Sequence, residues 1–378
     1  MDKQQRLYIL FFILLGVSYL ARADTIGIAK ELEIHYINVG QGGSTLIIGP
    51  NGTRILYDFG NKSGLYSLIP YFESLNWEQE KKLHYTILSH RDRDHYYGFK
   101  DLIDNDFDVL IANYGPLTGN RGSNLLSKRW IEPATKTTAG AVSKIRPGMR
   151  ISLGSGAELL VAAANGVVFD GTKIDVINEN DRSVSILIKY NEFEFILDGD
   201  LGGGAEVCSG HKTNQRDVQT QVALSLIERG EISAVKGVDV FHVAHHGSES
   251  SSPARYLSQL KPEIGLISVG NPNCKYQHPR QSVIYTLLKK HSLDPDLLDK
   301  ESCDDVTPVS HIFQTDRGST QCGPELSSLS DNSNIISGDI VLSTDGTTDY
   351  KIVTSGVTWT NGRRVKTELP QNFVFNLD

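Results

Sequence analysis

Residues 83–95 read Leu83-His84-Tyr85-Thr86-Ile87-Leu88-Ser89-His90-Arg91-Asp92-Arg93-Asp94-His95, and the other segments are interpreted around this stretch. Residues 83–88 form an apolar-rich run that predicts a buried strand. The loop after this run contains four metal-binding side chains: His90, Asp92, Asp94 and His95. In such a loop, alternate residues can turn toward one point, and the adjacent pair Asp94 and His95 can reach a second point beside it. Imidazole and carboxylate ligands together suit zinc, manganese or iron better than calcium.

The alternative for this loop is a polar turn in which Arg91 and Arg93 pair with the aspartates. Two other predicted strands argue against it, because they also end in metal-type side chains. Phe193–Leu197 is followed by Asp198-Gly199-Asp200, and Val238–Val243 runs into Ala244-His245-His246-Gly247-Ser248. Strand ends from one sheet system can meet at one rim, where Asp200 can bridge two ions with its two oxygens. Two ions about 3.5–4 Å apart can hold a hydroxide and polarise a phosphoryl or carbonyl oxygen, which predicts a hydrolase.

On an extended backbone, His245 and His246 point to opposite sides. We therefore expect one of them to bind metal and the other to face the substrate or support the site. A serine hydrolase is not expected, because Ser248 has no recognisable base or oxyanion hole. The strand at Arg54–Tyr57 ends in Asp58, which is either an ordinary turn residue or a carboxylate that orients a metal-bound histidine.

Short apolar-rich runs between turn residues predict strands along most of the chain. Besides those above, they are Leu32–Val39, Ser44–Ile48, Asp108–Ala112, Arg150–Leu153, Glu158–Ala164, Val184–Tyr190, Ile264–Val269, Ile340–Ser343 and Tyr350–Val353. Helical spacing of apolar residues predicts helices at Leu65–Leu75, Ser123–Trp130, Thr220–Glu228 and Ser282–Lys290. The polar segment near 293–334 is interpreted as an inserted loop, and residues 356–378 as a tail.

Residues 1–23 are typical of a secretory signal peptide. Lys3 and Arg6 precede the apolar run Leu7–Val17, and Ala21-Arg22-Ala23 offers small residues to a signal peptidase. The apolar run is short for a bilayer span, although a signal anchor is the alternative. No later segment is expected to cross a membrane. The sequence therefore predicts an exported protein, secreted or periplasmic.

Charge and cysteine content limit the partners and the type of metal site. The formal net charge of −8 argues against broad, nonspecific nucleic-acid binding but allows a small basic groove. None of the four cysteines lies in a CxxC pattern, so a cysteine zinc site is not expected. Export makes disulfides plausible, and we favour Cys303 with Cys322 and Cys208 with Cys274.

The motif at residues 90–95 resembles the HxHxDH signature of the metallo-β-lactamase superfamily, with Asp92 in place of the middle histidine. With four further segments it resembles the hydrolase domain of ComEC-like proteins, from about Glu33 to Lys290: Asn38-Val39-Gly40-Gln41-Gly42, Asp198-Gly199-Asp200, Ala244-His245-His246-Gly247-Ser248 and Ile267-Ser268-Val269-Gly270…His278-Pro279. The resemblance implies an α+β fold, an αββα four-layer sandwich, formed by a hydrolase domain over residues 30–355. It also implies two divalent ions, zinc or manganese, at one edge.

The resemblance assigns His90 and Asp92 to one ion and Asp94 and His95 to the other. Asp200 then bridges the ions, His245 completes the set and Asp58 supports it. The residues expected to act in catalysis are Asp94, His246 and His278, with a solvated loop histidine as the alternative for His278. Two positions depart from the family pattern. Asn180 stands in for a missing histidine, as a weak ligand or a hydrogen-bond donor, and Gly43 stands where ComEC-like chains usually carry Asp.

These inferences predict an exported metal-dependent hydrolase. The expected substrate is a phosphodiester, such as nucleic acid or a related molecule, attacked by a metal-bound hydroxide. Two alternatives stay open. One is a β-lactamase or lactonase that acts on a small molecule. The other is a non-catalytic binding protein on the same fold.

Overall fold

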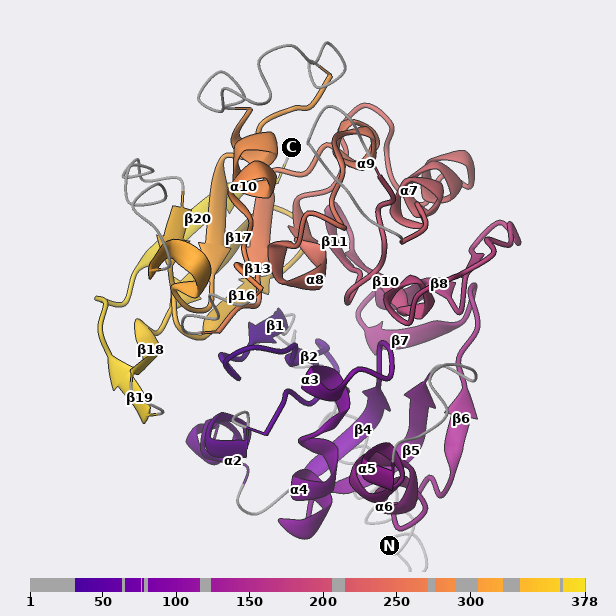
Figure 1. Ribbon diagram of the computed structural model, residues 1–378, viewed down its shortest axis with the longest axis vertical. Helices are drawn as coiled ribbons and strands as arrows, with labels where there is room; N and C mark the ends of the chain where they lie inside the picture. The colour runs from indigo at the N-terminus through magenta and orange to yellow at the C-terminus, as the bar shows by residue number, and fades with distance from the viewer. Residues whose placement is uncertain are drawn as a thin grey trace, which may run out of the picture. The chain divides into compact units, whose positions relative to one another are not determined.

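A computed structural model describes residues 31–62, 65–75, 77, 81–115, 124–205, 215–270, 276–289, 305–321, 334–360 and 363–377 (Figure 1). Contacts divide the chain after Lys30, and the description concerns the second unit, Glu31–Asp378. Residues 1–23 and all four cysteines lie outside the described residues, so the signal peptide and the disulfides remain predictions. Among the described residues, no helix is both long and apolar enough to span a bilayer.

The first sheet has the strand order β20-β17-β16-β1-β2-β3-β4-β5-β6. The strands β3, β4, β5 and β6 are parallel to one another, whereas the remaining pairs are antiparallel. In chain order the strands are β1 (Leu32–Tyr36), β2 (Thr45–Ile48), β3 (Arg54–Tyr57), β4 (Lys82–Ile87), β5 (Asp108–Gly115), β6 (Val142–Lys144), β16 (Ile340–Thr344), β17 (Asp349–Thr354) and β20 (Asn372–Asn376).

The second sheet has the order β15-β14-β13-β12-β11-β10-β8-β7, with β9 paired to β8. Here β11 to β15 are parallel. The strands are β7 (Arg150–Gly154), β8 (Ala157–Ala164), β9 (Val167–Val168), β10 (Ser185–Tyr190), β11 (Phe193–Leu197), β12 (Val240–His242), β13 (Ile264–Ile267), β14 (His311–Gln314) and β15 (Asn334–Ile336). A separate hairpin joins β18 (Val357–Thr360) to β19 (Arg363–Lys366).

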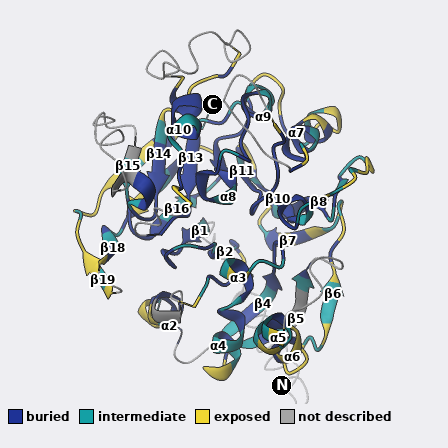
Figure 2. Cartoon of the chain, in the orientation of Figure 1, coloured by how far each residue is buried: buried dark blue, intermediate teal, exposed yellow. Residues whose placement is uncertain are grey.

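Helices cover the outer face of each sheet, so the sheets pack between two helical layers (Figures 1 and 2). Outside the first sheet lie α2 (Leu65–Ser74), α3 (Arg93–Tyr96), α4 (Phe99–Asp104), α5 (Asn124–Leu126), the π-helical turn Ser127–Ile131 and α6 (Glu132–Ala134). Outside the second lie α7 (Gln219–Glu228), α9 (Ala254–Leu260) and α10 (Gln281–Leu288). The short α8 (Ala244–Gly247) follows β12. The predicted αββα sandwich is confirmed.

Both faces of the central strands are buried, which explains their nearly unbroken apolar sequences. In β10, Ile186 and Ile188 enter the core between the sheets, whereas Leu187 packs against the outer helices. In β3, Leu56 faces the outer helices and Tyr57 faces the second sheet. Successive side chains of a strand alternate between its faces, so each strand contributes to two cores.

Parts of the segments interpreted as an inserted loop and a tail belong to the sheets. Within 293–334, β14 pairs with β13 through Ile264 and His311. Within 356–378, β20 pairs with β17 through Tyr350 and Phe375. These short strands pair with neighbouring strands of the two sheets. Their pairing is set by tertiary contacts that their own composition does not reveal.

A buried carboxylate anchors the loop that follows β11. Asp198 accepts hydrogen bonds from Ser185 Oγ at 2.6 Å, Gln219 Nε2 at 3.0 Å and Tyr256 Oη at 2.7 Å. These donors come from β10, α7 and α9, so the loop is tied to three elements just before Asp200. A buried carboxyl group needs such partners to offset its lost hydration.

The substitution Tyr256→Phe should lower the free energy of unfolding by about 2 kcal/mol, because it removes one donor from a buried carboxyl group. Urea denaturation measures the change. Tyr190→Phe is the matched control, since Tyr190 is buried but its hydroxyl makes no hydrogen bond with the described residues. Equal stability of Tyr256→Phe and wild type would contradict the anchoring role.

Burial raises the pKa of Glu194 from 4.5 to about 7, and the neighbouring Asp239 carboxylate adds to the shift. The folded state thus holds this proton more tightly than the unfolded state. The associated stability is complete below pH 4.5 and is lost as the pH rises toward 7. Glu194→Gln removes this proton-linked effect. Between pH 4.5 and 7, the unfolding free energy of the variant should therefore decrease by on the order of 2 kcal/mol less than that of wild type. Denaturation at several pH values tests this, with the exposed Glu73→Gln as control; an unchanged pH profile would contradict it.

Candidate metal centre

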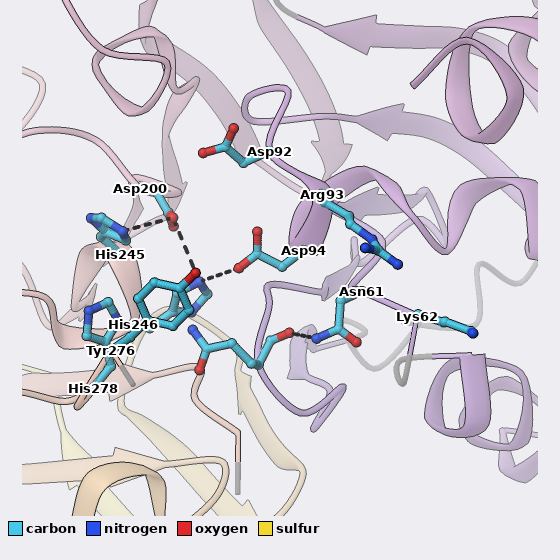
Figure 3. Close-up of a pocket in the computed structure, with 11 residues that line it drawn as sticks. Asn61, Lys62, Asp92, Arg93, Asp94, Asp200, His245, His246, Tyr276 and His278 are labelled. Atoms are coloured by element: carbon cyan, nitrogen blue, oxygen red, sulfur yellow. Dashed lines mark hydrogen bonds and ion pairs between the residues drawn. The ribbon is translucent and has the colours of Figure 1, made fainter. Parts of the chain in front are cut away.

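The predicted site residues come together where the carboxyl ends of two sets of parallel strands meet. Asp58 follows β3 and His90 follows β4 in the first sheet, while Asp200 follows β11 and His245 follows β12 in the second. A pocket of about 710 Å³ opens at this rim (Figure 3). Its lining residues are Gln41, Asn61, Lys62, Asp92, Arg93, Asp94, Asp200, His245, His246, Tyr276 and His278.

Hydrogen bonds between the sheets hold the two halves of the rim together. Val184 N donates to Ser89 O at 3.0 Å, and Tyr57 Oη donates to Val184 O at 2.5 Å. On the other side of the rim, Ser268 Oγ donates to Gly42 O at 2.7 Å. These contacts fix the distance between side chains that the two sheets supply separately.

Two groups of side chains have the composition of metal sites. One contains His90, His95 and Asp200, and the other contains Asp94, His95 and His246. Within each group the candidate ligand atoms lie within 4.8 Å of one another. His95 belongs to both groups, so the two candidate sites adjoin.

Asp200 faces four imidazoles. Its Oδ1 lies 3.3 Å from His95 Nε2. Its Oδ2 lies 3.8 Å from the Nε2 of His90 and 3.7 Å from the Nε2 atoms of both His245 and His246. One carboxylate therefore lies close to imidazoles of both groups, and its bridging role remains a prediction.

Asp58 orients the two histidines of the first sheet. Its Oδ2 accepts hydrogen bonds from His95 Nδ1 and Ser89 Oγ, both at 2.7 Å, and its Oδ1 accepts Ser89 N at 2.7 Å. Because Ser89 Oγ gives its only proton to Asp58, it must accept the proton of His90 Nδ1, 2.9 Å away. Both histidines thus carry the proton on Nδ1 and turn Nε2 toward Asp200. These contacts place Asp58 where one of its two predicted alternatives, the support of a metal-bound histidine, requires it to be.

The histidines of the second sheet are held in the same way. His246 Nδ1 lies 2.7 Å from Ser268 O, and a carbonyl oxygen can only accept, so Nδ1 is the donor. His245 Nδ1 lies 2.8 Å from Ser250 Oγ. Metal-binding histidines characteristically have their second nitrogen fixed by such an outer partner.

The extended backbone assumed for His245 and His246 is wrong. Both residues have left-handed backbone angles, with φ of 52° and 57°. This turn brings both Nε2 atoms to Asp200, so neither histidine points away from the centre. His246 Nε2 also lies 3.4 Å from Asp94 Oδ2, which places His246 among the candidate ligands in addition to its predicted catalytic role. Two consecutive left-handed residues other than glycine are strained, and such strain is common at functional sites.

Four buried atoms at the centre have no hydrogen-bond partner among the described residues: His90 Nε2, His95 Nε2, His246 Nε2 and Asp200 Oδ1. Buried polar atoms rarely stay unpaired, because each then loses its hydration without compensation. All four atoms are good ligands for a divalent cation. The residues present therefore fit the metal ions that the sequence resemblance implies.

The electrostatics of the cluster also favour a cation. Burial alone would raise the pKa of Asp200, but the His95, His246 and His245 imidazoles outweigh it and hold that pKa well below its usual value. Burial likewise opposes charge on His95, yet the Asp200 and Asp58 carboxylates raise its pKa well above the usual range. The carboxylates thus draw positive charge into the centre, and a bound metal ion would take the place of these protons.

His278 lies in the pocket beside the other histidines. Its ring centroid is 5.4 Å from that of His245 and 6.3 Å from that of His246. Burial lowers its pKa to about 3, with the neighbouring His245 and His246 adding to the shift. At neutral pH it is an uncharged imidazole, and its buried Nδ1 has no partner among the described residues.

The two departures from the family pattern lie at the centre. Asn180 Nδ2 is 3.3 Å from both ring nitrogens of His245, and Asn180 Oδ1 is buried without a partner among the described residues. A Cβ at Gly43 would lie 3.3 Å from His95 Nδ1 and 3.4 Å from Asp58 Oδ2. Asp92 is the outermost of the predicted ligands, with Oδ2 3.6 Å from His90 Nε2.

Sequence reasoning missed four residues that position the ligands: Ser89, Glu179, Ser250 and Ser268. Glu179 Oε1 accepts a hydrogen bond from Arg91 N at 3.0 Å, which fixes the start of the His90 loop. Ser89 was the one that could have been found, since it lies directly between the strand and His90. Ser250 lies only five residues after His245, and Glu179 and Ser268 act across separations of 88 and 22 residues.

No protein-family model matches this sequence. Two curated proteins are similar to it. ComE operon protein 3 of Bacillus subtilis (strain 168) is 25% identical over 283 residues, which cover 70% of this chain and 32% of that protein. Recombination protein 2 of Haemophilus influenzae (strain ATCC 51907 / DSM 11121 / KW20 / Rd) is 28% identical over 260 residues, covering 68% of this chain and 26% of that protein. The chain thus matches about a third or less of each relative's length.

Solved structures with similar folds have low sequence identity. The metallo-β-lactamase fold protein YhfI from Bacillus subtilis is 11% identical, with 64% of this chain and 88% of that chain covered and a TM-score of 0.38. CmlA, a diiron β-hydroxylase from Streptomyces venezuelae, is 12% identical, with 83% and 54% covered and a TM-score of 0.40. The predicted resemblance is confirmed: the chain forms an αββα sandwich and resembles ComEC-like proteins over 68–70% of its length.

Proposed function

We propose that this chain is an exported metal-dependent hydrolase that cleaves phosphodiester bonds with two divalent ions, zinc or manganese. One observation supports the metal centre above all others. Four imidazoles are each hydrogen-bonded at Nδ1 to an outer partner, and each directs Nε2 toward the Asp200 carboxylate. A structural cluster of histidines would use these nitrogens in hydrogen bonds, whereas the Nε2 atoms of His90, His95 and His246 are buried without a hydrogen-bond partner among the described residues.

The candidate ligands would divide between the two ions, and only the second set follows one of the two groups described above, with His95 assigned to it alone. His90, Asp92 and His245 would hold one ion, with Asn180 Oδ1 beside it, and Asp94, His95 and His246 would hold the other. Asp200 would bridge them. Two divalent ions bound there would supply Lewis-acid activation of water and stabilise charge on a phosphoryl oxygen.

The remaining groups of the pocket would position the substrate. His278 is uncharged at neutral pH and lies beside His245, so it can form a hydrogen bond with a substrate oxygen without repelling the ions. Gln41 and Asn61 also line the pocket. Phosphodiester cleavage is supported by the similarity to ComEC-like proteins. Export is supported by the signal-like sequence at residues 1–23.

The variant Asp200→Ala tests both the metal centre and the reaction. Wild-type protein should retain about two ions per chain, measured by elemental analysis, and should cleave bis-p-nitrophenyl phosphate and single-stranded DNA. Asp200→Ala should lose at least one ion and lower kcat/KM by about 100-fold or more, since it removes the bridging carboxylate. The matched control is Asp175→Ala, which removes an exposed carboxylate outside the pocket. Wild-type protein without bound metal would overturn the proposal, and turnover of a cephalosporin without phosphodiester cleavage would overturn its substrate.

The variant Ser89→Ala tests the hydrogen-bonded chain from Asp58 to His90. Loss of the hydroxyl leaves His90 Nδ1 without its acceptor, so metal affinity should fall by about 10–100-fold. Titration with a competing chelator measures this affinity. The control is Ser67→Ala, because Ser67 is also fully buried but its Oγ has no partner among the described residues. Equal affinities in the two variants would contradict the role of Ser89.

A further inference from the structure

The strand β20 forms one end of the first sheet (Figure 1). It reads Asn372-Phe373-Val374-Phe375-Asn376, a sequence that is the same in both directions. One side of β20 pairs with β17, and no strand among the described residues pairs with its other side. A strand at the end of a sheet presents a row of backbone N–H and C=O groups, to which another extended chain can bond.

The register with β17 shows which backbone groups of β20 point outward. Immediately before the strand, Thr354 N donates a hydrogen bond to Gln371 O at 3.0 Å. In an antiparallel pair, residues that bond to the partner alternate with residues that do not. Counted from Gln371, the backbone groups of Phe373 and Phe375 bond to β17. The residues between and beside them direct their N–H and C=O groups away from β17, and they are Asn372, Val374 and Asn376.

The same alternation separates the side chains of β20. Phe373 and Phe375 point into the core between the sheets, where their rings lie 5.0 Å and 6.5 Å from that of Phe313. Val374 lies on the outer face of the sheet and is 57% exposed. On the neighbouring β17, Val353 is 43% exposed on that same face. This end of the sheet thus has exposed valines on its outer face and aromatic rings on its inner face.

The composition of β20 does not protect it from pairing. Edge strands of natural proteins are usually very short or carry charged side chains or proline. At the other end of the first sheet, β6 includes the exposed Lys144, and at one end of the second sheet β7 begins with the exposed Arg150. At the other end of the second sheet, β15 has only 3 residues. The 5 residues of β20 include no charge and no proline, so a second copy would meet no like charge along this strand.

We propose that two copies of this chain associate by antiparallel pairing of their β20 strands about a two-fold axis at Val374. In this register Val374 faces its own counterpart, and Asn372 faces Asn376 of the second copy. The outward N–H and C=O groups of each strand then bond to those of the other. On the inner face, Phe373 meets Phe375 of the second copy. The two first sheets become one continuous sheet, and the same surface contacts itself, as in other two-fold dimers.

The sequence of β20 favours this register over its neighbours. A shift of one residue would place outward groups opposite groups that already bond to β17. A shift of two residues would place Val374 opposite an asparagine, and in one direction it would place Asn376 opposite Pro370, which has no N–H to donate. Cross-strand pairs of like apolar side chains stabilise a sheet, so the self-matching register is preferred. The association does not depend on the proposed hydrolase activity.

Sedimentation velocity over a range of concentrations tests the association, with protein purified after expression of the full chain. Wild type should form a dimer that dissociates to a monomer on dilution. Val374→Pro should raise the dissociation constant about tenfold or more, because proline lacks an N–H that the second copy uses and β17 does not. Val374→Lys should also weaken the dimer, since it places two like charges opposite each other at the axis. Circular dichroism checks that each variant is folded.

A control on the neighbouring strand separates pairing at the edge from a general effect of charge. Val353→Lys adds the same charge to an exposed valine of the same face, one strand away from the edge, and should stay dimeric. If Val374→Pro does not fold, Val374→Lys decides, because it replaces an exposed side chain. Wild type that is monomeric at its highest soluble concentration would overturn the proposal, whether the edge binds another segment of the chain or a different protein. A dimer that persists unchanged in Val374→Lys would also overturn it.

Cysteine crosslinking tests the register. The Cα atoms of a hydrogen-bonded antiparallel pair lie about 5.5 Å apart, a distance that a disulfide can span. Val374→Cys should therefore form a crosslinked dimer on mild oxidation, beyond any crosslink of the wild-type chain with its 4 cysteines. Asn372→Cys should not, because its two copies lie at opposite ends of the paired strands, whereas a mixture of Asn372→Cys and Asn376→Cys chains should. Crosslinking of Asn372→Cys without crosslinking of Val374→Cys would overturn the proposal.

Discussion

The three hydrogen bonds accepted by the Asp58 carboxylate are the contacts on which the geometry of the metal centre depends. They join the end of β3 to the loop after β4 and fix His95 directly and His90 through Ser89. Asp58 itself has a left-handed backbone, with φ of 60°. Charge-assisted hydrogen bonds offset the strain of this conformation and the cost of burying the carboxylate. The parallel register that pairs Tyr57 with Ile87 places these groups within reach of one another.

The centre also depends on the meeting of the two sheets, because neither sheet supplies a complete set of ligands. The first contributes the motif at residues 90–95, and the second contributes Asp200, His245 and His246. Asp200 lies among imidazoles from both sheets, so a cation bound there would connect them. Any ion that binds only the folded chain stabilises it by mass action. The metal centre and the packing of the sandwich are therefore energetically linked.

The fold could be predicted from sequence because its strongest signals are local. Runs such as those of β3 and β10 are apolar on both faces, and only strands between two layers need such runs. The strands β14 and β20 were not predicted, because their segments are polar or short and their pairing depends on neighbouring strands. Contacts of this kind arise only when the tertiary structure has formed.

The residues of the candidate site could be predicted from the sequence, but the orientation of their side chains was less predictable. Strand ends bearing histidine and aspartate indicated which side chains would meet, and the structure brings them together around Asp200. The left-handed turn at His245 and His246 was not predictable, since histidine does not favour this backbone and only the surrounding structure imposes it. Ser250 and Ser268 likewise gave no signal, because any hydroxyl or carbonyl correctly placed in space can fix an imidazole.

The acidity of the chain and the cations of its pocket act over different distances. The net charge of −8 repels a polyanion at long range, but salt reduces this repulsion beyond a Debye length of about 8 Å. Within the pocket, Arg93, Lys62 and any bound ions would lie closer to a bound anion than that length, so their attraction would be screened much less.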